Sequence, residues 1–185
     1  MKENFVLRPI TIVFLIVQII LLAACTTAPK HPPSSTLPSD QIQKLKNMHL
    51  PNSLPVPVDD IKRKALKDTW GASRSQGRAH EGIDIMAPRG TKVFSVTDGL
   101  IVDLRNNNLG GKVIWVMGPA GSWHYYAHLD AHKRGLNIGD SVKKGDIIGY
   151  VGNTGNARHT SPHLHYGIYL NGKGRGAVNP FPYLR

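Results

Sequence analysis

From residue 80 onward, short runs of apolar and β-branched residues alternate with glycine-containing turns. The runs richest in Val, Ile, Tyr and Trp are Lys92–Val102, Lys112–Met117, Trp123–Leu129, Asp146–Val151 and His163–Leu170. Strand-length runs at regular spacing, without helical periods between them, predict a compact antiparallel all-β domain. A domain of about 130 residues can bury roughly two thirds of its unfolded surface. One domain therefore accounts for this part of the chain.

The segment before the predicted sheet has a different pattern. Thr26–Asp40 is rich in Thr, Ser and Pro and predicts a flexible tether. Gln41–Leu50 spaces apolar residues three apart and predicts one short helix, which the prolines of Pro51–Pro57 end. Asp59–Leu66 starts with acidic residues and continues with basic ones, which is typical of a capped helical turn.

The N-terminus has the features of a bacterial lipoprotein signal. A basic start precedes the apolar run Ile10–Ala24, which is shorter than the roughly 20 residues that a membrane-spanning helix needs. The run ends in Leu-Ala-Ala-Cys, which resembles a lipobox and predicts lipidation of Cys25. We therefore expect a signal peptide at residues 1–24, a tether at 25–54 and the globular domain at 55–185.

The signal also predicts where the protein acts. Thr26 and Thr27 follow the cysteine, which predicts an outer-membrane address facing the periplasm if the source has two membranes. The chain has 23 Lys+Arg against 12 Asp+Glu, a formal net charge of +11. For an exported protein, attraction to an anionic wall polymer or lipid surface fits this charge better than nucleic acid does. A basic face that only aids solubility is an equal alternative.

Histidine occurs in three separated segments, His80–Asp84, Tyr126–Leu129 and His163–His165. On a strand, side chains two or four residues apart point to the same side. The histidine and aspartate of the first segment would therefore share a face, as would the two histidines of the third. Since Cys25 is the only cysteine, the donors are nitrogen and oxygen, which suit zinc.

This spacing predicts a tetrahedral site with an open corner for water. His80, Asp84 and one histidine of the third segment would close it. Spacing alone does not choose between His163 and His165.

The motifs and their order carry a resemblance to a known family. They read H-E-G-I-D-I-M-A-P-R-G-T, then Y-A-H-L, then S-P-H-L-H, with V-K-K-G-D-I-I-G-Y-V-G-N-T-G before the last. In this order they resemble the lysostaphin-like (LytM-type) zinc metallopeptidases. The resemblance covers roughly residues 69–181 and implies the family's compact antiparallel fold, a duplicated hybrid motif with a groove over the metal.

The resemblance also implies roles for single residues. It implies that His80, Asp84 and His165 hold one Zn²⁺ per chain. His128 and His163 correspond to the two unliganded catalytic histidines. The metal would lower the pKa of its water from about 15.7 toward 7, and the two imidazoles would carry protons. The sequence does not say which histidine takes which role.

This chain departs from the family pattern at two places, both of which flank the motifs. Neither departure changes an expected ligand. Tyr166-Gly167 stands where the family often has Phe-Glu. The family often reads F-G-x-R before the first motif, where this chain has one extra residue ahead of the arginine. Arg74 corresponds to that arginine and is expected to face the substrate or the developing oxyanion. His124, four residues before His128, is expected to be a partly exposed groove residue.

The predicted function is zinc-dependent hydrolysis of peptide cross-links in peptidoglycan, with its stem peptides as substrate and the membrane as anchor. In a source with two membranes the bond would be the D-alanyl–diaminopimelate cross-link, and glycyl–glycine bridges are the alternative in other walls. The competing function is a non-catalytic LytM-type lipoprotein that activates other wall hydrolases. A lipoyl-type carrier leaves the histidines unexplained. The sequence leaves open whether residues 40–66 cover the groove as an inhibitory plug.

Overall fold

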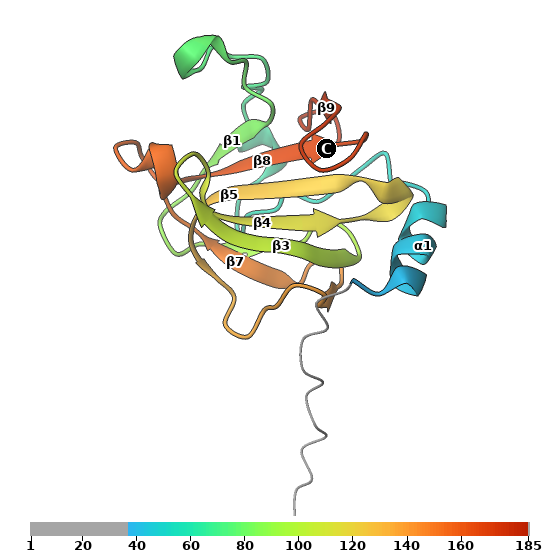
Figure 1. Ribbon diagram of the computed structural model, residues 1–185. Helices are drawn as coiled ribbons and strands as arrows, with labels where there is room; N and C mark the ends of the chain where they lie inside the picture. Colours follow the sequence, from blue (N-terminus) through green and yellow to red (C-terminus); the bar gives the residue numbers. More distant parts are fainter. Residues whose placement is uncertain (1–36, 185) are drawn as a thin grey trace, which may run out of the picture. The chain divides into compact units, whose positions relative to one another are not determined.

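The computed structural model describes residues 37–184, and the predicted lipidation site Cys25 lies outside them. Figure 1 shows a single β-sheet structure with few helices. The strands are β1 (Ile83–Met86), β2 (Lys92–Phe94), β3 (Gly99–Asn107), β4 (Gly111–Met117), β5 (Trp123–His132), β6 (Ser141–Val142), β7 (Ile147–Val151), β8 (His163–Tyr169) and β9 (Ala177–Val178). The helices are α1 (Ser39–Asn47) and the short 3₁₀ turns η1 (Arg63–Ala65), η2 (Ser75–Gly77), η3 (Pro119–Gly121) and η4 (Gly155–Ala157).

The main sheet has the strand order β1-β8-β5-β4-β3-β6. The strand β7 pairs with β5 and β2, and β9 pairs with β8. Every pairing between these strands is antiparallel. The predicted antiparallel all-β fold is therefore confirmed.

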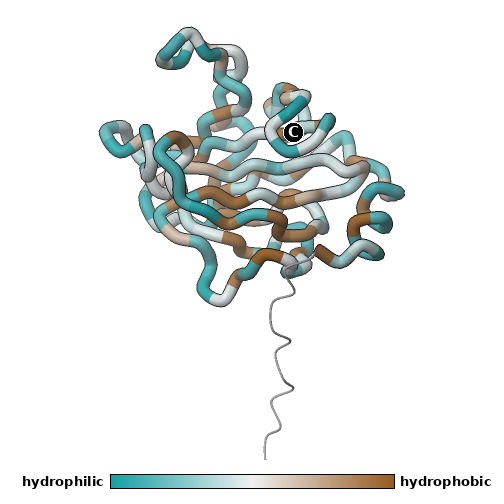
Figure 2. The backbone as a smooth tube through the Cα atoms, in the orientation of Figure 1, coloured by the Kyte–Doolittle hydropathy of each residue, from teal (hydrophilic) through white to brown (hydrophobic). Residues whose placement is uncertain are grey.

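The core lies against the inward faces of the long strands. Apolar residues alternate along them, and the fully buried set includes Ile83, Ile85, Ile101, Ile114, Val116, Tyr126, Leu129, Leu164, Tyr166 and Ile168. In Figure 2 the most hydrophobic stretches of the tube lie within strands, while the outer loops are mostly hydrophilic. Burial of these side chains, at about 25 cal/mol per Å² of apolar surface, stabilises the sheet.

Four predicted strands match β4, β5, β7 and β8 within a few residues. The predicted strand Lys92–Val102 is wrong in one respect, because it is two strands, β2 and β3. β2 pairs with β7 and β3 pairs with β4, so the chain must change partners between them. At this break the Ser95 hydroxyl donates a hydrogen bond to the Thr97 carbonyl.

The segment before the sheet contains the predicted short helix as α1. Leu45 of this helix is buried, and so is Leu54, whose backbone N–H donates to the Tyr183 carbonyl. The helical turn predicted over Asp59–Leu66 is confined to η1. The boundary between tether and peptidase domain at residue 55 stays a prediction. In residues 37–184 no helix has the length and hydropathy needed to cross a membrane.

Candidate metal centre

The pairing of two strands brings the predicted ligands together. In the antiparallel register of β1 and β8, Asp84 lies directly opposite His165. His80 was expected to lie on a strand with Asp84, which is wrong, because β1 begins only at Ile83. The chain before β1 nevertheless brings the His80 imidazole to the same point, since the His80 N–H donates to the Ala72 carbonyl and fixes the backbone there.

Three atoms of these residues that could bind a metal lie close to one another. The His80 Nε2 is 2.8 Å from the His165 Nδ1 and 3.1 Å from the Asp84 Oδ1. The His165 Nδ1 is 3.3 Å from the same carboxylate oxygen. Three atoms with lone pairs at such separations need a shared proton or a cation between them.

The donor set fits zinc. Two ligands each about 2.05 Å from an ion at the tetrahedral angle are about 3.3 Å apart, which is close to the three separations. Two imidazole nitrogens and one carboxylate oxygen leave a fourth corner, the pattern of catalytic zinc sites. Within residues 37–184 these three side chains form the one group of three or more His, Cys, Asp or Glu residues placed to hold a metal.

Thr69, which the sequence interpretation did not single out, orients two of these residues. Its carbonyl lies 2.7 Å from the His80 Nδ1, which must carry the proton since a carbonyl only accepts. The Nε2 of His80 then faces the site with its lone pair, as a metal-binding imidazole requires. The Thr69 hydroxyl accepts a hydrogen bond from the Asp84 N–H at 3.0 Å.

Gly82 is a second residue that the sequence interpretation missed. A Cβ at this position would lie 2.6 Å from the Tyr166 carbonyl oxygen and 2.7 Å from the Cε1 of the His165 ring. No side chain fits there without moving the His165 imidazole. A glycine midway between two expected ligands was the available signal.

A β-bulge aims His128 at the same point. The pairing of β5 with β4 runs from Leu129 to Tyr126 across a register shift, and His128 has a left-handed φ of 61°. Its N–H donates to the Gly110 carbonyl at 2.7 Å. Left-handed backbone costs a non-glycine residue on the order of 1 kcal/mol or more and is concentrated at functional sites.

The structure brings His128 and His163 together beside the three donor atoms. Their ring centroids are 5.0 Å apart, and the His163 Nε2 is 4.0 Å from the Asp84 Oδ1. The Nδ1 of His128 donates to the Thr154 carbonyl, and the Nδ1 of His163 donates to the Ser161 carbonyl. In each ring the Nε2 is therefore the nitrogen able to take up a proton.

Burial sets the protonation of these groups. Burial lowers the pKa of His128 to about 4 and also lowers the pKa of His165, so both imidazoles are neutral at pH 7. Burial raises the pKa of Asp84, but its contacts with the His165 and His80 imidazoles outweigh that effect and hold the pKa well below its usual range. Neutral imidazoles and an ionised carboxylate are the forms that bind a metal.

Arg74 contacts the centre through Asp84. Its Nη2 lies 2.5 Å from the Asp84 Oδ2, whereas the Oδ1 of the same carboxylate faces the two imidazoles. The guanidinium thus fixes which carboxylate oxygen points at the donors. Arg74 also lines the groove, and its contact with substrate stays a prediction.

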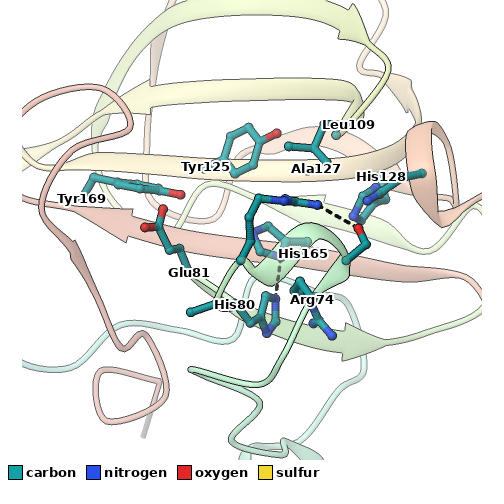
Figure 3. A pocket seen from close by; sticks show the side chains of 14 residues that line it. Arg74, His80, Glu81, Leu109, Tyr125, Ala127, His128, His165 and Tyr169 are labelled. Carbon is teal, nitrogen blue, oxygen red and sulfur yellow. Dashed lines mark hydrogen bonds between the residues drawn. The ribbon is translucent and has the colours of Figure 1, made fainter.

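A groove of about 460 Å³ lies over these residues. Its lining includes His80, His165 and His128 together with Arg78, Tyr125 and Tyr169. Figure 3 shows His165 between Glu81 and Tyr169 on one side and His128 on the other. The lining residues fall between Arg74 and Tyr169, so residues 40–66, suggested above as a plug, do not line this groove.

His124 does not lie in the groove, and the expectation of partial exposure was wrong. Its side chain is fully buried, with Nε2 3.0 Å from the Ser122 hydroxyl and Nδ1 2.9 Å from the Tyr166 hydroxyl. The expectation relied on uninterrupted alternation along β5, which the bulge at His128 breaks.

Comparison with known proteins agrees with this geometry. The chain is 37% identical over 129 residues to the L-Ala--D-Glu endopeptidase of Bacillus subtilis, an alignment covering 65% of this chain and 40% of that protein. It is 39% identical over 103 residues to the DD-carboxypeptidase/endopeptidase Mpg of Neisseria meningitidis, covering 56% of this chain and 22% of that protein. The chain therefore spans well under half the length of these relatives.

The fold matches a solved structure at a similar level of identity. The catalytic domain of lysostaphin from Staphylococcus simulans superimposes with a TM-score of 0.59 at 31% identity, covering 65% of this chain and 93% of that domain. Residues 78–180, more than half of the chain, match the sequence profile of peptidase family M23. Together with the groove and its donor set, this match shows that the chain belongs to peptidase family M23.

Proposed function

We propose that this protein is a zinc-dependent endopeptidase that hydrolyses peptide cross-links of peptidoglycan. The observation that carries the proposal is the convergence of the His80 Nε2, Asp84 Oδ1 and His165 Nδ1 within 3.3 Å of one another beside the groove. These three residues would hold the zinc ion. The ion, when bound, supplies a Lewis acid that makes water nucleophilic near neutral pH.

The two remaining histidines would move protons. His128 and His163 each use Nδ1 to hold a backbone carbonyl, which leaves Nε2 to take a proton from water or to give one to the departing amine. Burial lowers the pKa of His128 and keeps it neutral at pH 7, so its Nε2 carries a lone pair. Arg74 would orient Asp84 and offer positive charge to the substrate at the groove.

The relatives support a wall peptide as the substrate. The Bacillus protein is named for an L-Ala--D-Glu bond and the Neisseria protein for DD-peptide bonds. For a source with two membranes we propose the D-alanyl–diaminopimelate cross-link. We further propose that lipidated Cys25 anchors the domain to the outer membrane, within reach of the wall.

Digestion of purified cross-linked peptidoglycan tests this function. The protein is incubated with and without zinc, and the released fragments are identified by mass spectrometry. We expect zinc-dependent loss of cross-linked dimers, which the His163→Ala variant does not produce. If folded, zinc-loaded protein leaves the dimers intact, the proposal is wrong and a non-catalytic activator of other wall hydrolases takes its place.

A further inference from the structure

At the end of the groove away from His128 lie a carboxylate and aromatic side chains that the proposed hydrolysis does not use. Glu81 and Tyr169 line this end, which lies to the left of His165 in Figure 3, and Tyr125 lines the adjoining stretch of the groove. They come from three separate segments, the turn before β1, the strand β5 and the strand β8. This part of the groove combines one carboxylate with two aromatic rings.

A glycine allows these groups to approach one another. Gly167 of β8 lies opposite Tyr125 of β5 in the sheet. A Cβ on Gly167 would lie 3.0 Å from the Glu81 carbonyl oxygen and 3.0 Å from the Cε2 of Tyr169. Both neighbours would have to move away from any larger residue, so glycine sets the spacing of this end.

The Glu81 carboxylate faces solvent at the groove. Its neighbour Tyr169 keeps its proton, because burial and the nearby Glu81 charge raise the pKa of the phenol. Among the described residues 37–184, the ion pairs at the groove use Asp84, and no lysine or arginine pairs with Glu81. The carboxylate therefore keeps capacity for a cation from outside the chain.

The aromatic walls are held in place. The Tyr125 ring packs against Trp115 with 4.5 Å between centroids and meets the edge of His165 at 5.7 Å. A Cβ on Gly110 would lie 2.1 Å from the Tyr125 hydroxyl, so the phenol reaches the turn between β3 and β4. A rigid aromatic face next to a carboxylate is a favourable environment for an ammonium group.

We propose that Glu81, with Tyr125 and Tyr169, forms a subsite for a primary ammonium group of the substrate. In a D-alanyl–diaminopimelate cross-link, the side-chain amine of the acceptor residue is part of the cleaved amide. The free ammonium group is therefore that of the diamino acid that precedes the D-alanine in the donor peptide, whenever this amine is not acylated. The subsite would make the enzyme prefer peptides with a free amine at this residue over peptides in which the amine is acylated. This inference rests on the proposed function, since it assigns the substrate class of the same groove.

The test compares two synthetic cross-linked peptides that differ only in whether this amine is free or acetylated. The ratio of their kcat/KM values is measured with the zinc-loaded protein. Because Glu81 is exposed, we expect a preference for the free amine of about five-fold. The preference should disappear in Glu81→Gln and decrease in Tyr169→Phe, with zinc content unchanged in both.

Asp60→Asn is the matched control. It removes one negative charge from an exposed residue outside the groove, and asparagine tolerates the left-handed φ of 57° at this position. It should keep the five-fold preference. Equal rates on the two peptides, or a preference that survives in Glu81→Gln, would overturn the subsite and leave the proposed function standing.

A second readout separates failure of the subsite from failure of the proposed function. If neither peptide is cleaved, the proposed function is wrong, and calorimetric titration of the same two peptides decides the subsite. Tighter binding of the free amine that is lost in Glu81→Gln supports it. Equal affinities, or no binding of either peptide, overturn it.

Discussion

Two histidines on β5, His124 and His128, are four residues apart, but one is buried in the core and the other faces the groove. His124 points into the core, where it is fully buried between the hydroxyls of Ser122 and Tyr166. His128 points into the groove and lies against His163. Regular alternation would have placed both on one face of the strand.

The bulge explains the difference. His124 and Tyr126 face the core, while Tyr125 and Ala127 line the groove, so His128 would follow Tyr126 inward if alternation continued. The left-handed backbone at His128 inserts one unpaired position and turns its side chain outward. A local departure from regular strand geometry thus converts a core position into a groove position.

Removal of the His128 imidazole should give the largest effect. We expect His128→Ala to lower kcat/KM on a cross-linked peptide by about 100- to 10,000-fold, since a positioned proton carrier is lost. Zinc content, measured by elemental analysis, should remain one ion per chain. In contrast, His80→Ala should lose both zinc and activity. Loss of zinc from His128→Ala would contradict our assignment of the ligands.

The free energy of unfolding should decrease in acid because His124 is buried. Burial lowers its pKa from 6.5 to about 3 in the folded protein. Between these values the unfolded chain binds a proton that the native state does not, so the free energy of unfolding falls as pH decreases from 6.5 to 3. A shift of this size corresponds to about 5 kcal/mol.

The measurement is urea unfolding of metal-free protein at several pH values. His124→Gln, which keeps a hydrogen-bonding side chain, should be less stable at pH 7 but should lose less stability on acidification than the parent chain. Other buried histidines titrate in both proteins and cancel in the comparison. Equal pH slopes in the two proteins would contradict the burial argument.

The smallest effect separates backbone strain from side-chain chemistry. Because φ at His128 is 61°, His128→Gly should be more stable than His128→Ala by about 1 kcal/mol, while both are inactive. Thermal unfolding of the two variants checks this. Equal or lower stability of the glycine variant would mean that the left-handed backbone at residue 128 is not retained in these variants.

The long strands could be predicted because local pattern determines them, whereas the choice of His165 as the third expected ligand came from the family resemblance and stays a prediction. Runs such as Lys112–Met117 contain apolar residues at every buried position, and the His80–Asp84 spacing is short. β6 and β9, of two residues each, were not predicted since only pairing with β3 and β8 defines them. The bulge at His128 and the supporting roles of Thr69 and Gly82 depend on contacts between distant segments.

The pairing of β1 with β8 has a consequence for the mechanics of the domain. β1 has four residues and lies at one end of the strand order, where a strand is most easily peeled away. A cation shared by Asp84 and His165, 81 residues apart, would close most of the sheet into one loop, a cross-link that can be worth on the order of 4 kcal/mol. The ligands would then hold this edge strand to the sheet in addition to forming a reaction centre.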